Sequence, residues 1–185
     1  MTAPEAASVA RIAAGDRGAF EELFAAYHRR VFGYVFRMIG DAPRAEEVTS
    51  DVLFEVWKGA SRFAGRSRVS TWIFGIAHHK VIDAMRRRAA EPAREELPAA
   101  LADPGEQPDA GLVRETTRRR LRDALDRLTV EHREVVELAF FEEYSVAEIA
   151  AIVRCPANTV KTRLFHARKR LRDVLGAMGA KGGLA

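Results

Sequence analysis

The chain of 185 residues has a single cysteine, Cys155, and no long apolar run. One cysteine excludes an internal disulfide and any zinc site built from several thiolates. The apolar runs fall short of the roughly 20 residues that a membrane-spanning helix needs. The N-terminus also lacks the basic-then-apolar pattern of a signal peptide. These absences predict a soluble cytoplasmic protein.

The sequence also lacks the patterns of most enzymes and of β-structure. It shows no glycine-rich loop that could cradle a phosphate, no triad for nucleophilic catalysis and no set of metal ligands. The neighbouring His78 and His79 are poorly placed to share a metal ion, because consecutive side chains on a helix diverge by about 100°. Alternation of apolar and polar residues, the mark of strands, is absent. We therefore predict an all-α fold with no catalytic residue, no cofactor and no resident metal.

Charge divides the sequence into three parts. Residues 1–88 carry 14 basic and 10 acidic residues, residues 89–111 carry 1 and 6, and residues 112–185 carry 15 and 10. The middle part holds 4 of the 7 prolines and almost no large apolar residue, so it cannot bury enough surface to fold alone. The pattern predicts two small basic helical domains joined by an acidic, proline-rich flexible linker. Basic domains suit a polyanionic partner.

Apolar residues at helical spacing predict seven helices in all. Three lie in the first domain, and Asp16, Asp41 and Ser70 are expected to cap them. The second domain begins with helices at about 112–128 and 131–141, and two more follow.

The last two helices form the most informative stretch, residues 145–171. Ser145 and Glu148 have the spacing of a capping box, and Pro156 can open a helix but cannot sit inside one. A short helix, a tight turn and a longer helix with an exposed basic face are typical of a helix-turn-helix that enters the DNA major groove. A plain helical hairpin with a solvated basic face has the same pattern and stays open.

In their order and spacing, several segments resemble the extracytoplasmic-function sigma factors. These are the minimal group 4 members of the bacterial housekeeping-type sigma family, and they keep only regions two and four. Region two is matched by Phe20–Tyr27, Gly40–Glu47, Phe54–Trp57 and Ser70–Ala77, with Asp83, Arg86 and Arg87. Region four is matched by Leu128, Arg133–Val136, Tyr144–Ala150 and Thr159–Leu164, with Ala167, Arg168, Leu171 and Arg172. The resemblance covers nearly the whole chain.

The resemblance implies a protein that binds core RNA polymerase, directs it to a two-part promoter and helps to melt the DNA. It performs no covalent chemistry itself. Residues 1–88 would be region two, 89–111 the linker and 112–185 region four. An anti-sigma factor is the implied inhibitor, and the chain would be a monomer outside its complexes.

The resemblance also implies three contact surfaces. An acidic ridge with aromatic anchors would dock on the polymerase: Glu46, Glu47, Asp51, Phe54, Glu55 and Trp57. A loop and the third helix would take the melted minus-ten strand, with Arg88 as a further phosphate contact: Phe63, Arg66, Ser67, Trp72, His78, His79, Asp83, Arg86 and Arg87. The last helix would read the minus-thirty-five element as a duplex: Pro156, Asn158, Thr159, Lys161, Thr162, Arg163, Phe165, His166 and Lys169.

Plain structural interpretations stay open for these surfaces. The carboxylates could be a solvated face beside two core aromatics, and Trp72 could equally be a core residue. The linker could be a plain tether rather than a strand that threads the polymerase cleft. His79 stands where many members of the family have asparagine, which leaves the base preference open. The alternative function is a stand-alone helix-turn-helix regulator with a helical sensor domain.

Overall fold

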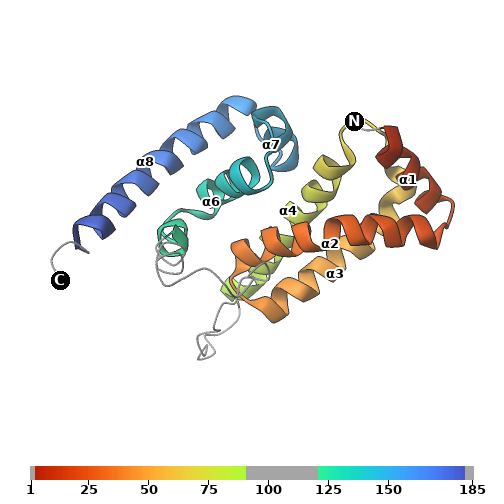
Figure 1. The fold of residues 1–185 in the computed structure, drawn as a ribbon, viewed down its shortest axis with the longest axis horizontal. Helices are drawn as coiled ribbons and strands as arrows, with labels where there is room; N and C mark the ends of the chain where they lie inside the picture. The colour runs from red at the N-terminus through yellow and green to blue at the C-terminus, as the bar shows by residue number, and fades with distance from the viewer. Residues whose placement is uncertain (1–2, 91–120, 182–185) are drawn as a thin grey trace, which may run out of the picture. The chain divides into compact units, whose positions relative to one another are not determined.

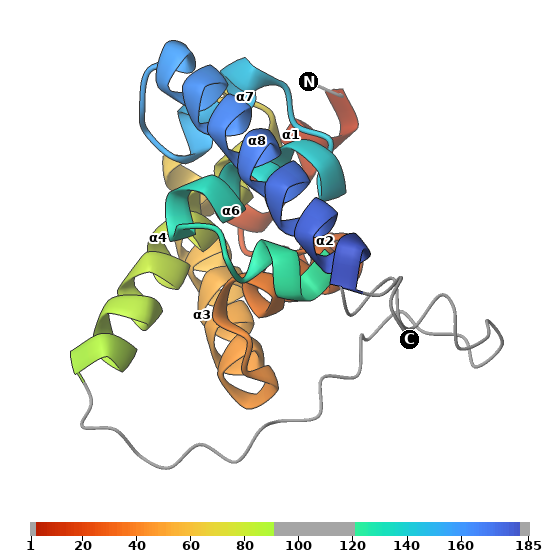
Figure 2. The same ribbon diagram turned by 90° about the vertical axis from the view of Figure 1, so that its left-hand side faces the viewer.

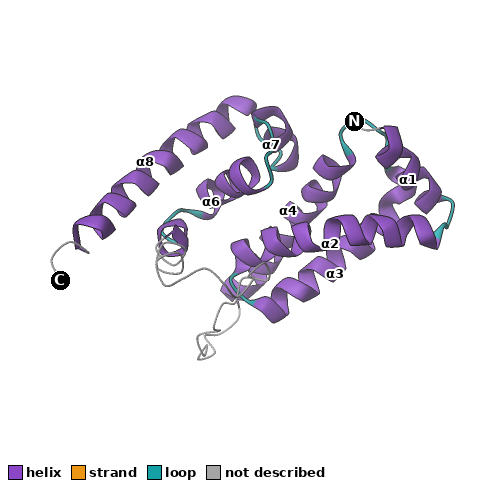
Figure 3. Ribbon diagram, in the orientation of Figure 1, coloured by secondary structure: helices purple, strands orange, loops and turns teal. Residues whose placement is uncertain are grey.

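The computed structural model describes residues 3–90 and 121–181, and it contains no strand within these ranges (Figures 1 and 3). The prediction of an all-α fold is confirmed. Two compact units are present: α1 to α4 belong to the first, and α6, α8 and most of α7 belong to the second. Of the predicted linker, only Ala89 and Ala90 are described, and both belong to α4. No described helix is long and apolar enough to cross a bilayer.

The first unit consists of four α-helices and one short 3-10 helix. They are α1 (Ala3–Ala13), α2 (Arg17–Ile39), α3 (Ala42–Gly59), η1 (Ala60–Arg62) and α4 (Val69–Ala90). Helix α3 packs against both α2 and α4, which also contact each other (Figures 1 and 2). The sequence analysis did not predict α1. A helix of 11 residues is marginal by itself, so its packing on the other helices stabilises it.

The core of this unit follows the apolar stripes of its helices. In α3 the apolar stripe made of Val48, Val52 and Val56 is buried. The first half of α4 is covered on several sides. Trp72 and Ile76 are only half-buried, and the α4 core consists of Val69, Ile73, Phe74, Ala77 and Val81.

Two of the three predicted helix caps are confirmed. The Asp16 carboxylate accepts a hydrogen bond from the Ala19 backbone N–H at 3.1 Å, and the Asp41 carboxylate accepts one from Arg44 N at 3.0 Å. The prediction for Ser70 is wrong. Helix α4 begins one residue earlier, at Val69, so Ser70 lies inside the first turn and is buried there.

The second unit contains α6 (Val130–Val136), the π-helical segment η2 (Glu137–Phe141), α7 (Val146–Ile152) and α8 (Ala157–Lys181). The predicted helix at 131–141 is confirmed, with its second half wound as a π-helix. Of the helix predicted at 112–128, only residues 121–128 are described, and 121–125 are helical. Arg133 ties α6 to that segment, because its Nε donates to the Leu125 carbonyl at 3.2 Å. Helix α6 also packs against α8.

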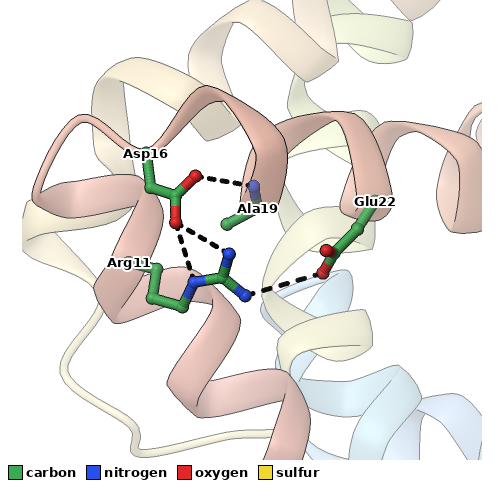
Figure 4. Close-up of polar contacts among 4 residues, drawn as sticks. All are labelled: Arg11, Asp16, Ala19 and Glu22. Atoms are coloured by element: carbon green, nitrogen blue, oxygen red, sulfur yellow. Dashed lines mark hydrogen bonds and ion pairs between the residues drawn. The ribbon is translucent and has the colours of Figure 1, made fainter.

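A small polar cluster closes the corner between α1 and α2 (Figure 4). Arg11 Nε donates to Asp16 Oδ2 at 2.8 Å, and Arg11 Nη1 lies 3.7 Å from Glu22 Oε2. The pKa of Asp16 is lowered, first by the hydrogen bond from the Ala19 N–H and then by the bond from Arg11. Folding therefore favours the ionised carboxylate.

This lowered pKa predicts a pH-dependent contribution of Asp16 to stability. The contribution is fully present above the unfolded-state value of about 3.9 and is lost as the pH falls through the lower folded-state value. Asp16→Ala should lower the urea midpoint of the first unit at neutral pH. The gap from the wild type should shrink as the pH approaches about 3.

Tryptophan fluorescence measures this unit alone, because both tryptophans, Trp57 and Trp72, belong to it. Glu22→Ala is the control. It removes a distant, exposed partner of Arg11 and should move the midpoint little at any pH. A gap between the wild type and Asp16→Ala that stays constant over this pH range would contradict the assignment.

Candidate nucleic-acid interface and docking surface

Four carboxylates of α3 form an acidic ridge: Glu46, Glu47, Asp51 and Glu55. The first three are exposed and Glu55 is half-buried, whereas the neighbouring valine stripe is buried. The ridge therefore has the exposure that a docking surface requires.

Three of the ridge carboxylates lie beside cationic groups of the same unit. The ion pairs are His28 with Glu46 at 3.7 Å, Lys80 with Asp51 at 3.5 Å and Arg62 with Glu55 at 3.8 Å, and the first requires a protonated His28. These pairs are long and partly or fully solvated, so each contributes less than about 1 kcal/mol. A cationic partner could replace them at little cost.

The aromatic residues beside the ridge are divided between surface and core. Phe54 is 60% exposed and carries the Lys58 ammonium 5.3 Å from its ring centroid. Trp57 is half-buried and meets Phe20 edge to face at 5.0 Å. The interpretation of both aromatics as core residues is therefore wrong for Phe54. The sequence analysis missed a further exposed ring, Phe24, which stacks on His28. Its position four residues after Phe20 and four before His28 could have indicated that the three rings share one face of α2.

The segment 63–68, which joins η1 to α4, has half-buried aromatic residues at its base and an exposed middle. The rings of Phe63 and Trp72 lie 4.9 Å apart, and both are half-buried. Trp72 also covers Gly59, where an added Cβ would lie 3.5 Å from the indole. Gly65 takes the left-handed conformation, with φ of 64°. Beyond it, Arg66 is exposed and Ser67 is half-buried.

Further along α4, the candidate polar residues lie on the accessible part of the helix. His78 and His79 are half-buried, with their rings 5.1 Å apart. Asp83 is exposed and binds Arg86 at 3.1 Å, and Arg87 is exposed as well. In the described ranges, no three histidine, cysteine or acidic residues lie together as metal ligands would.

Arg88 differs from its two neighbours. Its Nη1 donates a hydrogen bond to the carbonyl of Ile39, at 3.0 Å, and the side chain is half-buried. The guanidinium therefore satisfies a carbonyl at the C-terminus of α2, a structural role that the sequence analysis did not predict for Arg88.

The capping box of α7 is confirmed in both directions. Ser145 N donates to Glu148 Oε2 at 2.9 Å, and Glu148 N donates to Ser145 Oγ at 3.3 Å. The turn after α7 places Arg154 at φ 49°, in the left-handed region that glycine usually occupies. This segment therefore makes a helix-turn-helix turn without a glycine.

Helix α8 buries one side and presents the other to solvent. Val160, Leu164 and Ala167 are buried, whereas Thr159 and Arg163 are half-buried. The exposed candidates are Pro156, Asn158, Lys161, Thr162, Phe165, His166 and Lys169. The predicted minus-thirty-five residues thus lie in the first half of α8, with Pro156 directly before it.

Several of these side chains contact other residues of the second unit, and the His166 ring stacks on His132 at 6.2 Å. Arg163 Nη1 lies 4.0 Å from Cys155 Sγ in the turn, and the Thr162 hydroxyl donates to the Asn158 carbonyl at 3.0 Å. Phe165 is 65% exposed although its ring meets that of His166 edge to face at 5.4 Å.

Comparison with known proteins accounts for both units. The Sigma-70 region 2 model matches residues 23–91, and the Sigma-70 region 4 model matches residues 118–171. The ECF RNA polymerase sigma factor SigK of Mycobacterium tuberculosis is 32% identical over 168 residues, which are 89% of this chain and 90% of SigK. The chain belongs to the ECF RNA polymerase sigma factors. The ECF RNA polymerase sigma factor RpoE of Cereibacter sphaeroides is 36% identical over 161 residues, covering 85% of this chain and 87% of the relative.

A solved sigma factor has the same fold. It is the sigma factor RpoE of Bartonella quintana, solved in complex with the anti-sigma factor NepR. The TM-score is 0.68 and the sequence identity is 23%, and the match covers 85% of this chain and 96% of the solved one. In the present chain, the acidic ridge and the 63–68 loop belong to the region 2 match, and the helix-turn-helix belongs to the region 4 match. Helix α1 precedes both.

The two arginines at the end of α4 should have different roles in the sigma factor. Arg88→Ala should lower the stability of the first unit by about 1 kcal/mol through the lost bond to Ile39, with the salt dependence of promoter binding unchanged. Arg87→Ala should leave stability unchanged and reduce the salt slope by about 1.

Urea unfolding followed by tryptophan fluorescence measures stability, and binding of the polymerase holoenzyme to promoter DNA at several salt concentrations measures the slope. A reduced slope without lost stability for Arg88→Ala would make Arg88 a phosphate contact after all.

Proposed function

We propose that this sigma factor docks on core RNA polymerase through the acidic ridge with Phe54 and Trp57, captures the melted minus-ten strand with the 63–68 loop and α4, and reads the minus-thirty-five element through α8. The observation that carries the proposal is the helix-turn-helix of the second unit. Its long helix buries an apolar back and leaves cationic, polar and aromatic side chains exposed on its first turns. Such a surface suits the major groove of duplex DNA.

Docking is supported by the combination of charge and exposed apolar surface on α3. The solvated ion pairs of the ridge can be exchanged for pairs with a cationic partner. Phe54 offers a ring whose burial in a complex would supply apolar binding energy that charge alone does not. The half-buried Trp57 would contribute its accessible edge.

Capture of the melted strand is supported by the ring pair at the base of the 63–68 loop. A base that leaves the duplex loses stacking, and an aromatic face can replace that contact. The half-buried rings of Phe63 and Trp72 lie 4.9 Å apart, and Arg66 of the same loop is exposed. On α4, His78, His79 and Asp83 would add polar contacts, and Arg86 and Arg87 would hold phosphates.

Control by an anti-sigma factor is supported by the solved relative, which is bound to the anti-sigma factor NepR. An inhibitor of this chain would compete with polymerase for the ridge and Phe54. The remaining parts of the proposal follow from the family: the chain acts in the cytoplasm, performs no covalent chemistry and is monomeric outside its complexes. Its region two, linker and region four would span 1–88, 89–111 and 112–185.

Charge reversal on the ridge tests docking. Asp51→Lys or Glu55→Lys should weaken binding to core polymerase by about tenfold, because each places a cation where a carboxylate would meet a cationic partner. Fluorescence anisotropy of a labelled chain titrated with core polymerase measures the affinity. Glu22→Lys makes a similar charge change on α2 and should leave the affinity within about twofold. Equal losses in all three variants would mean that net charge, not the ridge, governs docking.

Two substitutions on α8 separate reading of bases from contact with phosphates. Phe165→Ala should change the preferred upstream sequence, because an exposed ring on the third turn of α8 can contact base edges. Lys169→Ala should weaken all duplexes alike and reduce the salt slope by about 1. Selection of promoters from a randomised library by the holoenzyme distinguishes these effects. An unchanged upstream sequence for Phe165→Ala would remove this ring from the reading surface.

A further inference from the structure

Helix α1 lies before the segment that matches region 2, which starts at residue 23, yet it is part of the core of the first unit. It packs on α2 and also contacts η1, α3 and α4. Its Val9 and Ile12 side chains are almost completely buried. The helix is therefore held by packing against α2, which follows it directly, and against η1 and α4, which begin more than 45 residues after it ends.

Polar contacts fix α1 at both ends. Near its start, the hydroxyl of the buried Tyr27 donates to Glu5 Oε1 at 2.9 Å. Near its end, Arg11 binds Asp16 and lies close to Glu22 (Figure 4). Contacts at two separated points restrict both rotation and sliding of a short helix. The position of α1 on the unit is thus well defined.

Two of the elements that α1 contacts, η1 and α4, flank the 63–68 loop. Helix η1 leads into the loop and α4 leaves it, and Ala60 and Val69 on either side are both buried. Between these anchors, residues 64–66 are exposed. A loop whose ends are held firmly loses less conformational entropy when it binds a ligand than one whose ends move.

We propose that α1 is a positioning element for the 63–68 loop. It holds η1 and the start of α4 in the arrangement that presents Phe63 and Trp72 to a base of the melted strand. This inference rests on the proposed function of that loop. Loosening α1 should therefore weaken capture of the melted strand, while docking through the outward face of α3 should stay intact.

The matched substitutions Ile12→Ala and Ile39→Ala test the inference. Both replace a buried isoleucine of the first unit by alanine. Ile12 belongs to α1, whereas Ile39 ends α2 beside the last turns of α4, where its carbonyl meets Arg88. Each variant is assembled with core polymerase, and stability is followed by tryptophan fluorescence.

Two affinities are measured for each holoenzyme. The first is that of the chain for core polymerase. The second is that of the holoenzyme for a promoter whose minus-ten region is already open, as a mismatched bubble that carries 2-aminopurine. Ile12→Ala should weaken bubble binding by about tenfold and leave docking within about twofold. Ile39→Ala should leave both affinities within about twofold at a similar loss of stability.

A milder variant keeps the test valid if Ile12→Ala does not fold. Tyr27→Phe removes the hydroxyl that holds Glu5 without creating a cavity, and it should weaken bubble binding by about threefold with docking unchanged. Parallel losses of docking and bubble binding, or equal effects of Ile12→Ala and Ile39→Ala, would reduce α1 to a purely structural element and overturn the inference.

Phe63→Ala distinguishes a failure of this inference from a failure of the proposed function. It removes a ring of the loop itself and should weaken bubble binding in the same way as the α1 variants. If Phe63→Ala leaves bubble binding unchanged, the loop is not the strand-binding site, and the proposed function of the loop fails together with the inference. If Phe63→Ala weakens bubble binding and Ile12→Ala does not, only the inference fails.

Discussion

Burial of the valine stripe of α3 between α2 and α4 is the contact on which the surfaces of the first unit depend. Val52 and Val56 are completely buried, and burying each valine contributes about 1.5–3 kcal/mol. The ion pairs of the acidic ridge are exposed, and each contributes less than about 1 kcal/mol. The apolar contacts therefore set the rotation of α3, and the carboxylates face solvent as a consequence.

The second unit uses local hydrogen bonds where the first relies on long-range packing. The reciprocal bonds between Ser145 and Glu148 define the start of α7. Arg154 then adopts a left-handed backbone conformation. For a residue other than glycine, this conformation costs about 1–2 kcal/mol. Burial of Val160, Leu164 and Ala167 offsets this cost and leaves the opposite face of α8 for DNA.

Both proposed binding faces combine exposed aromatic rings with nearby charge. Phe54 lies beside the acidic ridge, and Phe165 lies between Lys161 and Lys169 on α8. Charge speeds association and selects partners, whereas a buried ring supplies much of the affinity. The two faces differ in the sign of their charge, which suits a cationic protein surface in one case and DNA in the other.

The sequence by itself determined the all-helical fold, the caps at Asp16, Asp41 and Ser145, and the helix-turn-helix. These features depend on side chains three or four residues apart, so their contacts can be read from local spacing. The family likeness rests on the same short motifs in order. The candidate residues on α8 follow as well, because one buried stripe decides which side of a single helix remains exposed.

Only the tertiary structure decided features whose partners lie far apart in the chain. Arg88 binds a carbonyl 49 residues before it, and Ser70 is buried by packing around the first turn of α4. Phe24 and Phe54 are exposed, while Trp57 is half covered by Phe20. The position of α1 depends on η1 and α4, which are distant in sequence. Helical spacing shows which residues share a face, but only the packing of helices decides which faces are covered.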